Sequence, residues 1–432
     1  MRLYSTKNPN KFVTLKEAVF KGLPEDNGLF MPESIPLLPK YFIQNLKKYS
    51  FQEIAYKVTK TLLAGAIPNR QLKKIIEESI TFSAPIVSLN KQYHILELFH
   101  GPSLAFKDFG ARFMAQLMSY FNKGADKELT ILVATSGDTG GAVAAGFYKT
   151  PGIKVIILYP SGKVSNLQEK QLTTLGHNIS ALEVNGTFDD CQALVKKAFL
   201  DRECSNHLRL SSANSINIAR LIPQSFYYFE AYKQLEKTRK KTVFCVPSGN
   251  FGNLTAGLLA KKMGLPIHHF IAATNANDVV PGYLNSGQYH PRPSIPTISN
   301  AMDVGNPSNF VRMLNLYNSE WGMMKADISG FSYDDGQTRL GVKEVFDQYN
   351  YIIDTHGAVG YLALKDYLQK NKTHRGVILE TAHPSKFIDE VEKVLNKKIE
   401  IPERLAVLAN KKKEAKFIDP NFDDFKNHLL SL

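Results

Sequence analysis

A repeating pattern of apolar runs and polar turns organises the chain from about residue 86 onward. Short runs rich in β-branched residues lead into turns rich in glycine, serine or asparagine, and then into residues at helical spacing. The runs that we expect to form strands cover residues 93–98, 129–134, 155–159, 182–184, 242–246, 270–274 and 377–381. Strands that alternate with helices predict an α/β fold with a mainly parallel sheet. Ligands of such sheets bind beyond the carboxyl ends of the strands.

The helices that follow these strands are marked by their own periodicity. A small-residue helix is expected around residues 142–148, and further helices at 191–199, 254–263 and 384–395. Asp189 or Asp190 would cap the helix at 191–199, and Pro384 would lie in the first turn of the last one.

The first 80 or so residues have a different pattern. Amphipathic spacing predicts helices at 15–20, 51–63 and 71–80, joined by a proline-rich segment at 31–39. We therefore expect a mostly helical N-terminal unit at residues 1–82, a catalytic core at 83–400 and a C-terminal extension at 401–432. A proline-rich stretch at 281–296 is expected to leave the core as an excursion.

Composition indicates a globular protein rather than a membrane-spanning or secreted one. The chain is 44% hydrophobic and 22% charged, as in ordinary globular proteins, and its apolar runs are far shorter than the roughly 20 residues of a membrane span. The first residues lack the apolar stretch of a signal peptide, so a cytoplasmic location with no membrane partner is expected. The chain has three cysteines, Cys191, Cys204 and Cys245, and none of them has the spacing of a zinc knuckle. We therefore expect them to be buried thiols, and we expect no metal.

The net charge of +13 leaves three interpretations open: nucleic-acid binding, attraction of an anionic substrate, or a lysine-rich genome. The basic residues are spread out, and residues 411–413 form the only tight run of lysines. Zinc-finger and RNA-recognition signatures are missing from the sequence. We expect no nucleic-acid partner, and a non-enzymatic binding module is the competing hypothesis.

Lys107 is the first candidate for chemistry. Aromatic and apolar residues at spacings of three or four predict a helix from about residue 104, with Ser103 as its N-cap. The positive end of that helix and the neighbouring Phe106 would both disfavour a charged ammonium on Lys107. A lysine with a lowered pKa can attack an aldehyde. Taken alone, a surface lysine that extends from an amphipathic helix is the commoner explanation.

Two glycine-rich turns change that balance. Residues 246–253 join a strand to a helix, and Gly249 and Gly252 would let backbone N–H groups approach a phosphate. Residues 134–141 form a second such turn, in which the Ser136 and Thr139 hydroxyls could assist. Neither turn is a Walker A or a dinucleotide fingerprint. Together with Lys107 they predict a site for a phosphorylated cofactor and an anionic substrate.

Three segments closely resemble the threonine synthase family. Residues 97–108, Glu-Leu-Phe-His-Gly-Pro-Ser-Leu-Ala-Phe-Lys-Asp, resemble its lysine motif, residues 135–140 its substrate loop and residues 247–252 its cofactor-phosphate loop. The likeness continues in order at residues 28–30, 211–217, 299–303 and 381–387. The sequence departs from the family at Ser103, where many members have threonine, and at Thr355, where a proline is expected before His356. We therefore assign His356 no role.

The resemblance implies the fold and the reaction. The fold would be that of a fold-type-II pyridoxal-phosphate enzyme, similar to tryptophan synthase β, with two open, mainly parallel α/β subdomains. The activity would be the pyridoxal 5'-phosphate-dependent conversion of O-phospho-L-homoserine and water to L-threonine and phosphate, by γ-elimination and β-addition of water. That is the last step of threonine biosynthesis. The alternative is a related phospholyase or dehydratase acting on a hydroxy or phosphohydroxy amino acid. A monomer or homodimer is expected.

The resemblance also implies residue roles. Lys107 would form the Schiff base, Thr381 would face the ring nitrogen, and Asp138 would lie near the ring hydroxyl. His383 would orient its loop. The cofactor phosphate would be bound by Ser248, Gly249, Asn250, Phe251, Gly252 and Asn253. The candidates for binding the substrate are Ser136, Thr139, Lys163, Ser211, Asn214 and Arg220.

Overall fold

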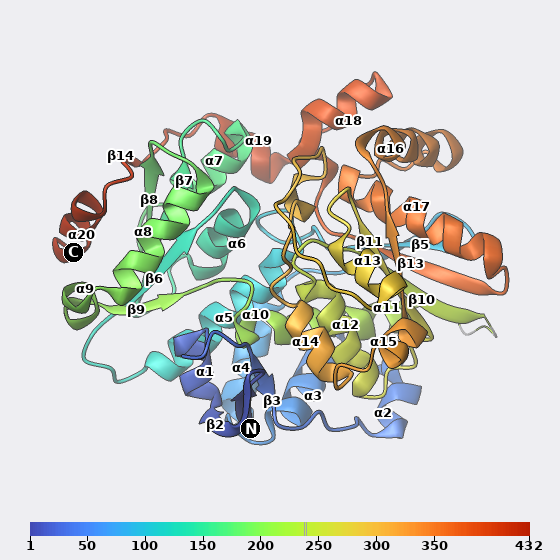
Figure 1. Ribbon diagram of the computed structural model, residues 1–432, viewed down its shortest axis with the longest axis horizontal. Helices are drawn as coiled ribbons and strands as arrows, with labels where there is room; N and C mark the ends of the chain where they lie inside the picture. The colour runs from blue at the N-terminus through green and yellow to red at the C-terminus, as the bar shows by residue number, and fades with distance from the viewer. Residues whose placement is uncertain (237, 239) are drawn as a thin grey trace.

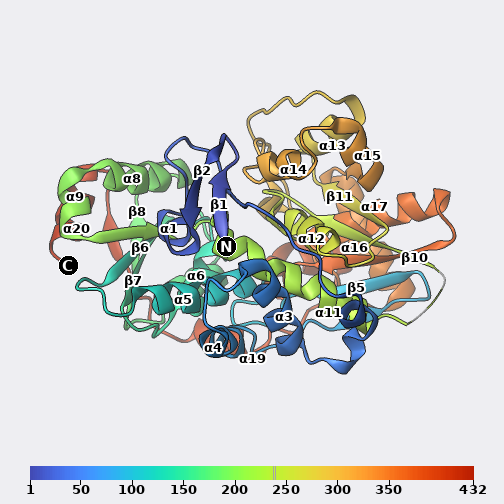
Figure 2. The same ribbon diagram turned by 90° about the horizontal axis from the view of Figure 1, so that it is seen from below.

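The computed structural model describes residues 1–236, 238 and 240–432. Two open β-sheets flanked by helices lie side by side, and the N-terminal segment packs below both of them in the view of Figure 1. Figure 2, seen from below, shows the same N-terminal segment in front of the two halves. The two α/β subdomains expected from the family resemblance are therefore present.

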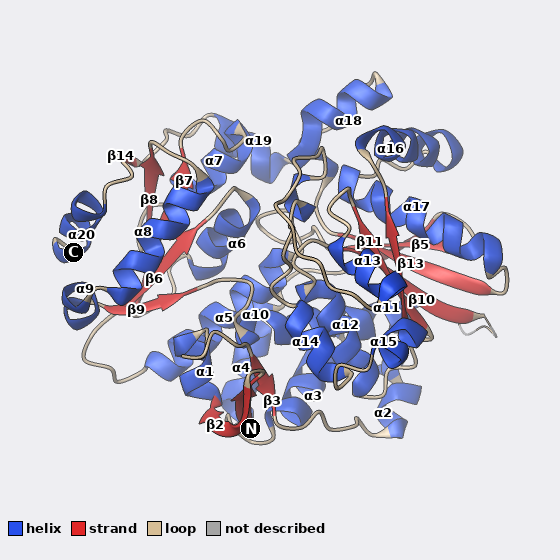
Figure 3. Ribbon diagram, viewed as in Figure 1, coloured by secondary structure: helices blue, strands red, loops and turns tan. Residues whose placement is uncertain are grey.

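The larger sheet has the order β12-β11-β10-β13-β5-β4. Neighbouring strands are parallel except for the antiparallel pair of β4 and β5. Its strands are β4 (Ile86–Ser88), β5 (Tyr93–Glu97), β10 (Lys241–Pro247), β11 (His269–Thr274), β12 (Ile328–Ser332) and β13 (His374–Glu380). Helices cover both faces in Figure 3, which explains why β13 is buried at every residue.

The smaller sheet has the order β14-β8-β7-β6-β9, and all its pairs are parallel. Its strands are β6 (Leu129–Ala134), β7 (Ile153–Pro160), β8 (Ile179–Val184), β9 (Arg209–Ser212) and β14 (Lys416–Ile418). The edge strand β14 comes from the C-terminal segment, so residues after 400 complete this sheet. The sequence reading missed β14 because three residues are too few to show a period.

All seven predicted strand runs are strands in the structure, with ends within a few residues of those expected. The helices of the two halves are α5 (Lys107–Asn122), α6 (Asp138–Phe147), α7 (Asn166–Thr173), α8 (Phe188–Leu200), α9 (Arg202–His207), α10 (Ile218–Leu221), η2 (Ile222–Ser225), α11 (Phe226–Gln234), α12 (Gly252–Lys262), α13 (Val279–Ser286), η3 (Asn300–Met302), α14 (Phe310–Leu316), α15 (Trp321–Asp327), α16 (Asp335–Tyr349), α17 (Thr355–Lys370), η4 (Pro384–Phe387), α18 (Ile388–Leu395), α19 (Glu403–Ala409) and α20 (Phe422–Leu430). No helix in the described part of the chain is long and apolar enough to cross a membrane.

The N-terminal unit contains the predicted helices and a sheet that was not predicted. Its helices are α1 (Leu15–Lys21), α2 (Lys40–Gln44), η1 (Leu46–Lys48), α3 (Phe51–Leu63) and α4 (Asn69–Ser79). Capping boxes at Thr14 and Ser50 start α1 and α3. The antiparallel sheet has the order β2-β1-β3, from β1 (Arg2–Ser5), β2 (Asn8–Thr14) and β3 (Phe30–Pro32). Exposed polar residues fill most of β2, so its sequence lacks the alternation that would have revealed it.

Several predicted helix starts were wrong. Helix α5 begins at Lys107 rather than near residue 104, because Leu104 takes a left-handed backbone with φ 58°. Ser103 does not cap it, and α8 is capped by Thr187 through a capping box rather than by Asp189 or Asp190. The segment expected to be one helix at 384–395 is a 3₁₀ turn followed by α18.

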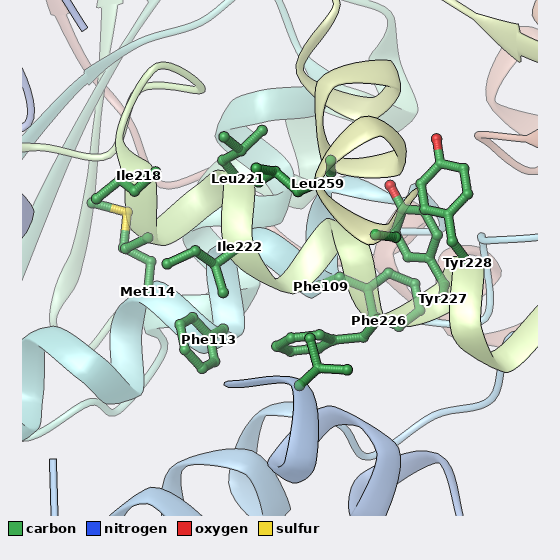
Figure 4. Close-up of a cluster of buried hydrophobic side chains, with 14 of the residues drawn as sticks. Phe109, Phe113, Met114, Ile218, Leu221, Ile222, Phe226, Tyr227, Tyr228 and Leu259 are labelled. Carbon is green, nitrogen blue, oxygen red and sulfur yellow. The ribbon is translucent and has the colours of Figure 1, made fainter. Parts of the chain in front are cut away.

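A cluster of buried hydrophobic side chains joins α5 to α10, α11 and α12 (Figure 4). Phe109 of α5 contacts Tyr227 of α11 with ring centroids 5.2 Å apart, and Phe113 contacts Phe226 at 5.9 Å. Such edge-to-face pairs prefer a defined geometry. These contacts fix α5, which begins at Lys107, relative to α11, which precedes β10.

Candidate active site

The start of α5 lies against the end of β13. The Phe106 N–H donates to the Thr381 carbonyl at 2.8 Å, and the His383 N–H donates to the Leu104 carbonyl at 3.0 Å. An isolated antiparallel bridge joins Ala105 and Ala382 between these two bonds. Two segments far apart in sequence are thereby held together, which brings the first residue of α5, Lys107, next to Thr381.

Lys107 faces a buried carboxylate that a second lysine also contacts. Its Nζ lies 3.4 Å from Asp138 Oδ2, and the Lys386 Nζ lies 2.8 Å from Asp138 Oδ1. The side chains of Asp138 and Lys386 are 8% and 1% exposed, and that of Lys107 is 18% exposed. We call Lys107, Asp138 and Lys386 the charge cluster. Its net charge is positive when both lysines are protonated and zero when Lys107 is neutral.

Burial and neighbouring charges set the protonation of this cluster. Burial lowers the pKa of Lys107, the Lys386 ammonium lowers it further, and Asp138 only partly opposes the two. Burial would raise the pKa of Asp138, but the ammonium groups of Lys386 and Lys107 outweigh it and hold that pKa below its usual range. The cluster therefore keeps an ionised carboxylate beside an amine that loses its proton readily.

Lys386 is a site residue that the sequence did not predict, although it lies in the segment at 381–387 that resembles the family. Besides Asp138, its ammonium donates to the Ser103 carbonyl at 2.9 Å and to Gln171 Oε1 at 3.2 Å. Three acceptors match the three donors of an ammonium group, so the group is held in one place. Gln168 Nε2 donates to Asp138 Oδ1 at 2.9 Å and fixes that carboxylate from another side. A second lysine in a family-like segment was the available signal.

The turn at 246–253, which we call the phosphate loop, joins β10 to α12. Phe251 has a left-handed backbone with φ 58°, which turns the chain into the helix. A Cβ built at Gly249 would lie 2.8 Å from Met302 Cα and 2.9 Å from the Ala301 carbonyl oxygen. The segment at 299–303 thus packs directly on the loop, and only glycine fits there.

Asn253 offers a buried donor at this loop. The hydroxyls of Tyr227 and Tyr228 both donate to its Oδ1, at 2.7 and 2.8 Å. Its Nδ2 is buried and has no hydrogen-bond partner among the described residues. A buried donor without an acceptor is costly, so an acceptor bound at the loop would be favoured. The start of α12 adds positive potential at the same point.

The turn at 134–141, which we call the acidic loop because it contains Asp138, is organised differently. The Thr135 hydroxyl oxygen accepts from the Gly137 and Gly140 N–H groups, at 3.0 and 2.8 Å. Two backbone donors of this loop are therefore already occupied. Ser136 is exposed and Thr139 is half-buried, so both hydroxyls remain accessible beside the charge cluster.

The other predicted substrate residues are dispersed. Arg220 is buried, its Nη1 donates to the Ala213 carbonyl at 2.8 Å, and burial lowers its pKa to about 10. The Ser211 hydroxyl donates to the Phe20 carbonyl of α1 at 2.7 Å. Asn214 is exposed, as is Lys163 in the turn after β7. Arg220 also contributes to the lowered pKa of Lys107, so its charge reaches the cluster.

Comparison with known families gives three consistent matches. The family described as pyridoxal-phosphate dependent enzyme matches residues 84–381. The threonine synthase N-terminal family matches residues 2–80, and the threonine synthase C-terminal family matches residues 357–429. The first of these alone spans more than half of the chain.

Individual relatives agree. The chain is 45% identical over 433 residues to the threonine synthase of Buchnera aphidicola subsp. Acyrthosiphon pisum, covering 100% of both proteins. It is 46% identical over 411 residues to that of Escherichia coli K12, covering 95% of each. Among solved structures, threonine synthase from Escherichia coli matches with a TM-score of 0.91 at 44% identity over 100% of both chains. The pyridoxal-phosphate-bound threonine synthase of Brucella melitensis matches with a TM-score of 0.94 at 33% identity, over 100% of this chain and 99% of that one.

Proposed function

The chain belongs to the threonine synthase family of pyridoxal-phosphate-dependent enzymes, and from that premise we propose which of its residues carry out the reaction. Its function is to convert O-phospho-L-homoserine and water to L-threonine and phosphate, with pyridoxal 5'-phosphate as cofactor. The observation that carries the assignment of roles is the buried charge cluster at the start of α5.

The residues of the site fit the cofactor. The phosphate loop offers the unpartnered Nδ2 of Asn253 among the described residues, and its Gly249 and Gly252 are half-buried. Thr381, which the family resemblance sets opposite the ring nitrogen, adjoins Lys107. When bound, the cofactor supplies an aldehyde for a lysine amine and a conjugated ring that stabilises negative charge on substrate carbons.

We assign proton transfer to Lys107. Its lowered pKa provides a neutral amine that can attach to an aldehyde, take a proton from the substrate α-carbon and return it. Asp138 keeps the Lys107 ammonium in place whenever Lys107 is protonated. Lys386 acts as a positioning residue because it ionises Asp138 and lowers the pKa of Lys107 from a fixed position.

For the substrate, we propose Ser136 and Thr139 as the first donors to its phosphate, since both hydroxyls are accessible beside Asp138. Lys163, Asn214 and Arg220 are proposed to complete the binding of that dianion. The contact of Ser211 with α1 gives it a supporting role, holding the segment that carries Asn214.

The direct test is product analysis. Holoprotein incubated with O-phospho-L-homoserine is expected to release L-threonine and phosphate in equal amounts. Borohydride reduction of the holoprotein, followed by peptide mapping, is expected to find the cofactor on Lys107. Phosphate released together with a keto acid instead of threonine would move the activity to the related phospholyases or dehydratases. A label on another lysine would overturn the role of Lys107.

The organisation and setting of the protein remain proposals. We propose the division at residues 1–82, 83–400 and 401–432, with the last part completing the smaller sheet through β14. A cytoplasmic location, a monomer or homodimer and the absence of a nucleic-acid partner are further predictions. Size-exclusion chromatography with light scattering tests the oligomeric state.

A further inference from the structure

Asn309, the residue before α14, presents an unused donor beside the phosphate loop. It is 0% exposed, and its Nδ2 has no hydrogen-bond partner within the described part of the chain. Its backbone N–H donates to the Asn250 carbonyl at 3.2 Å. A Cβ built at Gly252 would lie 3.3 Å from the Asn309 Nδ2. The amide nitrogen is therefore held against the first residue of α12.

The direction of this amide is fixed by Arg312. The Arg312 Nη1 donates to the Asn309 Oδ1 at 2.7 Å, and a guanidinium has donors only, so the two amide atoms cannot exchange places. Arg312 is itself fully buried and bonded to backbone. Its Nε and Nη2 donate to the Phe30 carbonyl of β3, at 3.2 and 3.0 Å, and its Nη2 donates to the Ile216 carbonyl at 2.7 Å. The N-terminal sheet thus sets the orientation of a side chain at the phosphate loop.

Asn253, the residue after Gly252, also has a bonded amide oxygen and a free amide nitrogen within the described residues. Tyrosine hydroxyls occupy its amide oxygen, so its Nδ2 is also left without a partner in the described residues. The Gln224 Oε1 is a nearby acceptor that is likewise unpartnered there, 3.9 Å from the Cβ position of Gly252. With two lone pairs, that oxygen can accept at most two of the four N–H groups that the two amides carry. Two NH₂ groups whose amide oxygens are already bonded favour a bound group that accepts hydrogen bonds, and the oxygens of a phosphate do so.

We propose that the Asn309 side-chain amide is a direct ligand of the cofactor phosphate. Arg312 of α14, which is bonded to the Phe30 carbonyl of β3, is then the positioning residue that orients this amide. The inference rests on the proposed function, because the phosphate is that of the cofactor. It gives the N-terminal unit a part in cofactor binding, although none of its side chains has been placed in the site.

The test compares two ligands that differ only in the phosphate. Asn309→Asp keeps the shape of the side chain and removes both N–H donors, while Asn309→Ala removes them without adding charge. Asn318→Asp, at an exposed position after α14, is the matched control for the change in charge. Each apoprotein is titrated with pyridoxal 5'-phosphate by absorbance and fluorescence, and the rate at which pyridoxal labels Lys107 under borohydride is measured in parallel.

Loss of a hydrogen bond to a charged group corresponds to an affinity for pyridoxal 5'-phosphate about 10- to 100-fold weaker in both Asn309 variants. Labelling by pyridoxal, which lacks the phosphate, is expected to stay near the wild-type rate, and inorganic phosphate is expected to stabilise the wild-type apoprotein more than the variants. Affinity within twofold of wild type in Asn309→Ala overturns the proposal, as does an equal loss for pyridoxal. Failure of both ligands to label Lys107 in the wild type would instead overturn the proposed function, and this inference with it.

Discussion

The acidic loop and the phosphate loop look alike in sequence but do different things in the structure. Each is a glycine-rich turn from a parallel strand into a helix, and both were predicted to bind anions. In the acidic loop, Thr135 occupies two backbone donors and Asp138 brings a negative charge that two lysines surround. At the phosphate loop, the Nδ2 donors of Asn253 and of the neighbouring Asn309 remain without partners in the described residues.

This difference indicates that one loop serves the reaction and the other binds the cofactor. Charges that set the pKa of a nucleophile gather at the acidic loop, whereas donors that suit an anion gather at the phosphate loop. A helix start is therefore no sufficient sign of an anion site, because its own side chains can occupy the donors first. Substitutions at the two loops should separate turnover from cofactor affinity.

The largest effect is expected for Lys107→Ala. Removing the amine eliminates both the covalent attachment and the proton carrier, and turnover is expected to fall about 1,000-fold or more. Because the phosphate loop is untouched, the variant should still bind the cofactor non-covalently. Stopped assays of threonine and equilibrium dialysis of the cofactor measure the two quantities. Complete loss of cofactor binding would contradict the separation of roles.

Gly249→Ala should produce the opposite result. Its Cβ would lie within 2.9 Å of the backbone of Ala301 and Met302, and such overpacking costs about 1–3 kcal/mol. Cofactor affinity is then expected to fall about 10- to 100-fold, with turnover at saturating cofactor little changed. Gly141→Ala in the acidic loop is the matched control, since its Cβ would meet Gln171 Oε1 at an ordinary 3.4 Å. Equal losses in the two variants would remove the contrast.

Lys386→Met tests the charge cluster through pH. Lys386 lowers the pKa of Lys107, so its removal should raise that pKa and leave less neutral amine at neutral pH. The rate at which pyridoxal attaches to Lys107 rises with pH as the amine loses its proton. That rise is expected at higher pH in the variant than in the wild type. Lys412→Met, at an exposed position, should leave the profile unchanged. An unshifted profile in Lys386→Met would contradict the positioning role.

The smallest effect is expected for Glu380→Gln, next to the site but outside both loops. Burial and the neighbouring Asp354 raise the pKa of Glu380 well above its usual value. A carboxyl with a raised folded-state pKa contributes its stability fully below its unfolded pKa, about 4.3, and loses it as pH rises through the folded value. Glutamine imitates the protonated form, so the variant should gain unfolding free energy relative to wild type between pH 4 and pH 8.

Urea unfolding at the two pH values measures that gain. Glu344→Gln is the opposite control, because hydrogen bonds from Lys365 and Tyr361 outweigh burial and lower the pKa of Glu344. Its carboxylate contributes stability that is present above its unfolded pKa and lost as pH falls. That variant should therefore lose stability at pH 8. A Glu380→Gln variant that is less stable at pH 8 than at pH 4, relative to wild type, would contradict the assignment.

The sequence predicted strands, turns and motif residues because these features depend on neighbouring residues in the chain. Continuous apolar runs marked all seven predicted strands, and the family-like segments identified Lys107, both loops and the reaction. The misses were local as well: β2 shows no alternation, and the left-handed Leu104 delayed the start of α5.

The tertiary structure alone decided which side chains meet. Lys386 reaches Asp138 because the segment after β13 folds across Ala105, and Asn309 reaches the phosphate loop because Arg312 spans β3 and α14. Such contacts join residues far apart in the chain, and no periodicity or motif spacing records them. The sequence by itself determined the elements, the family and the reactive lysine. Packing between the elements determined which charges surround Asp138 and which donors at the phosphate loop stay free among the described residues.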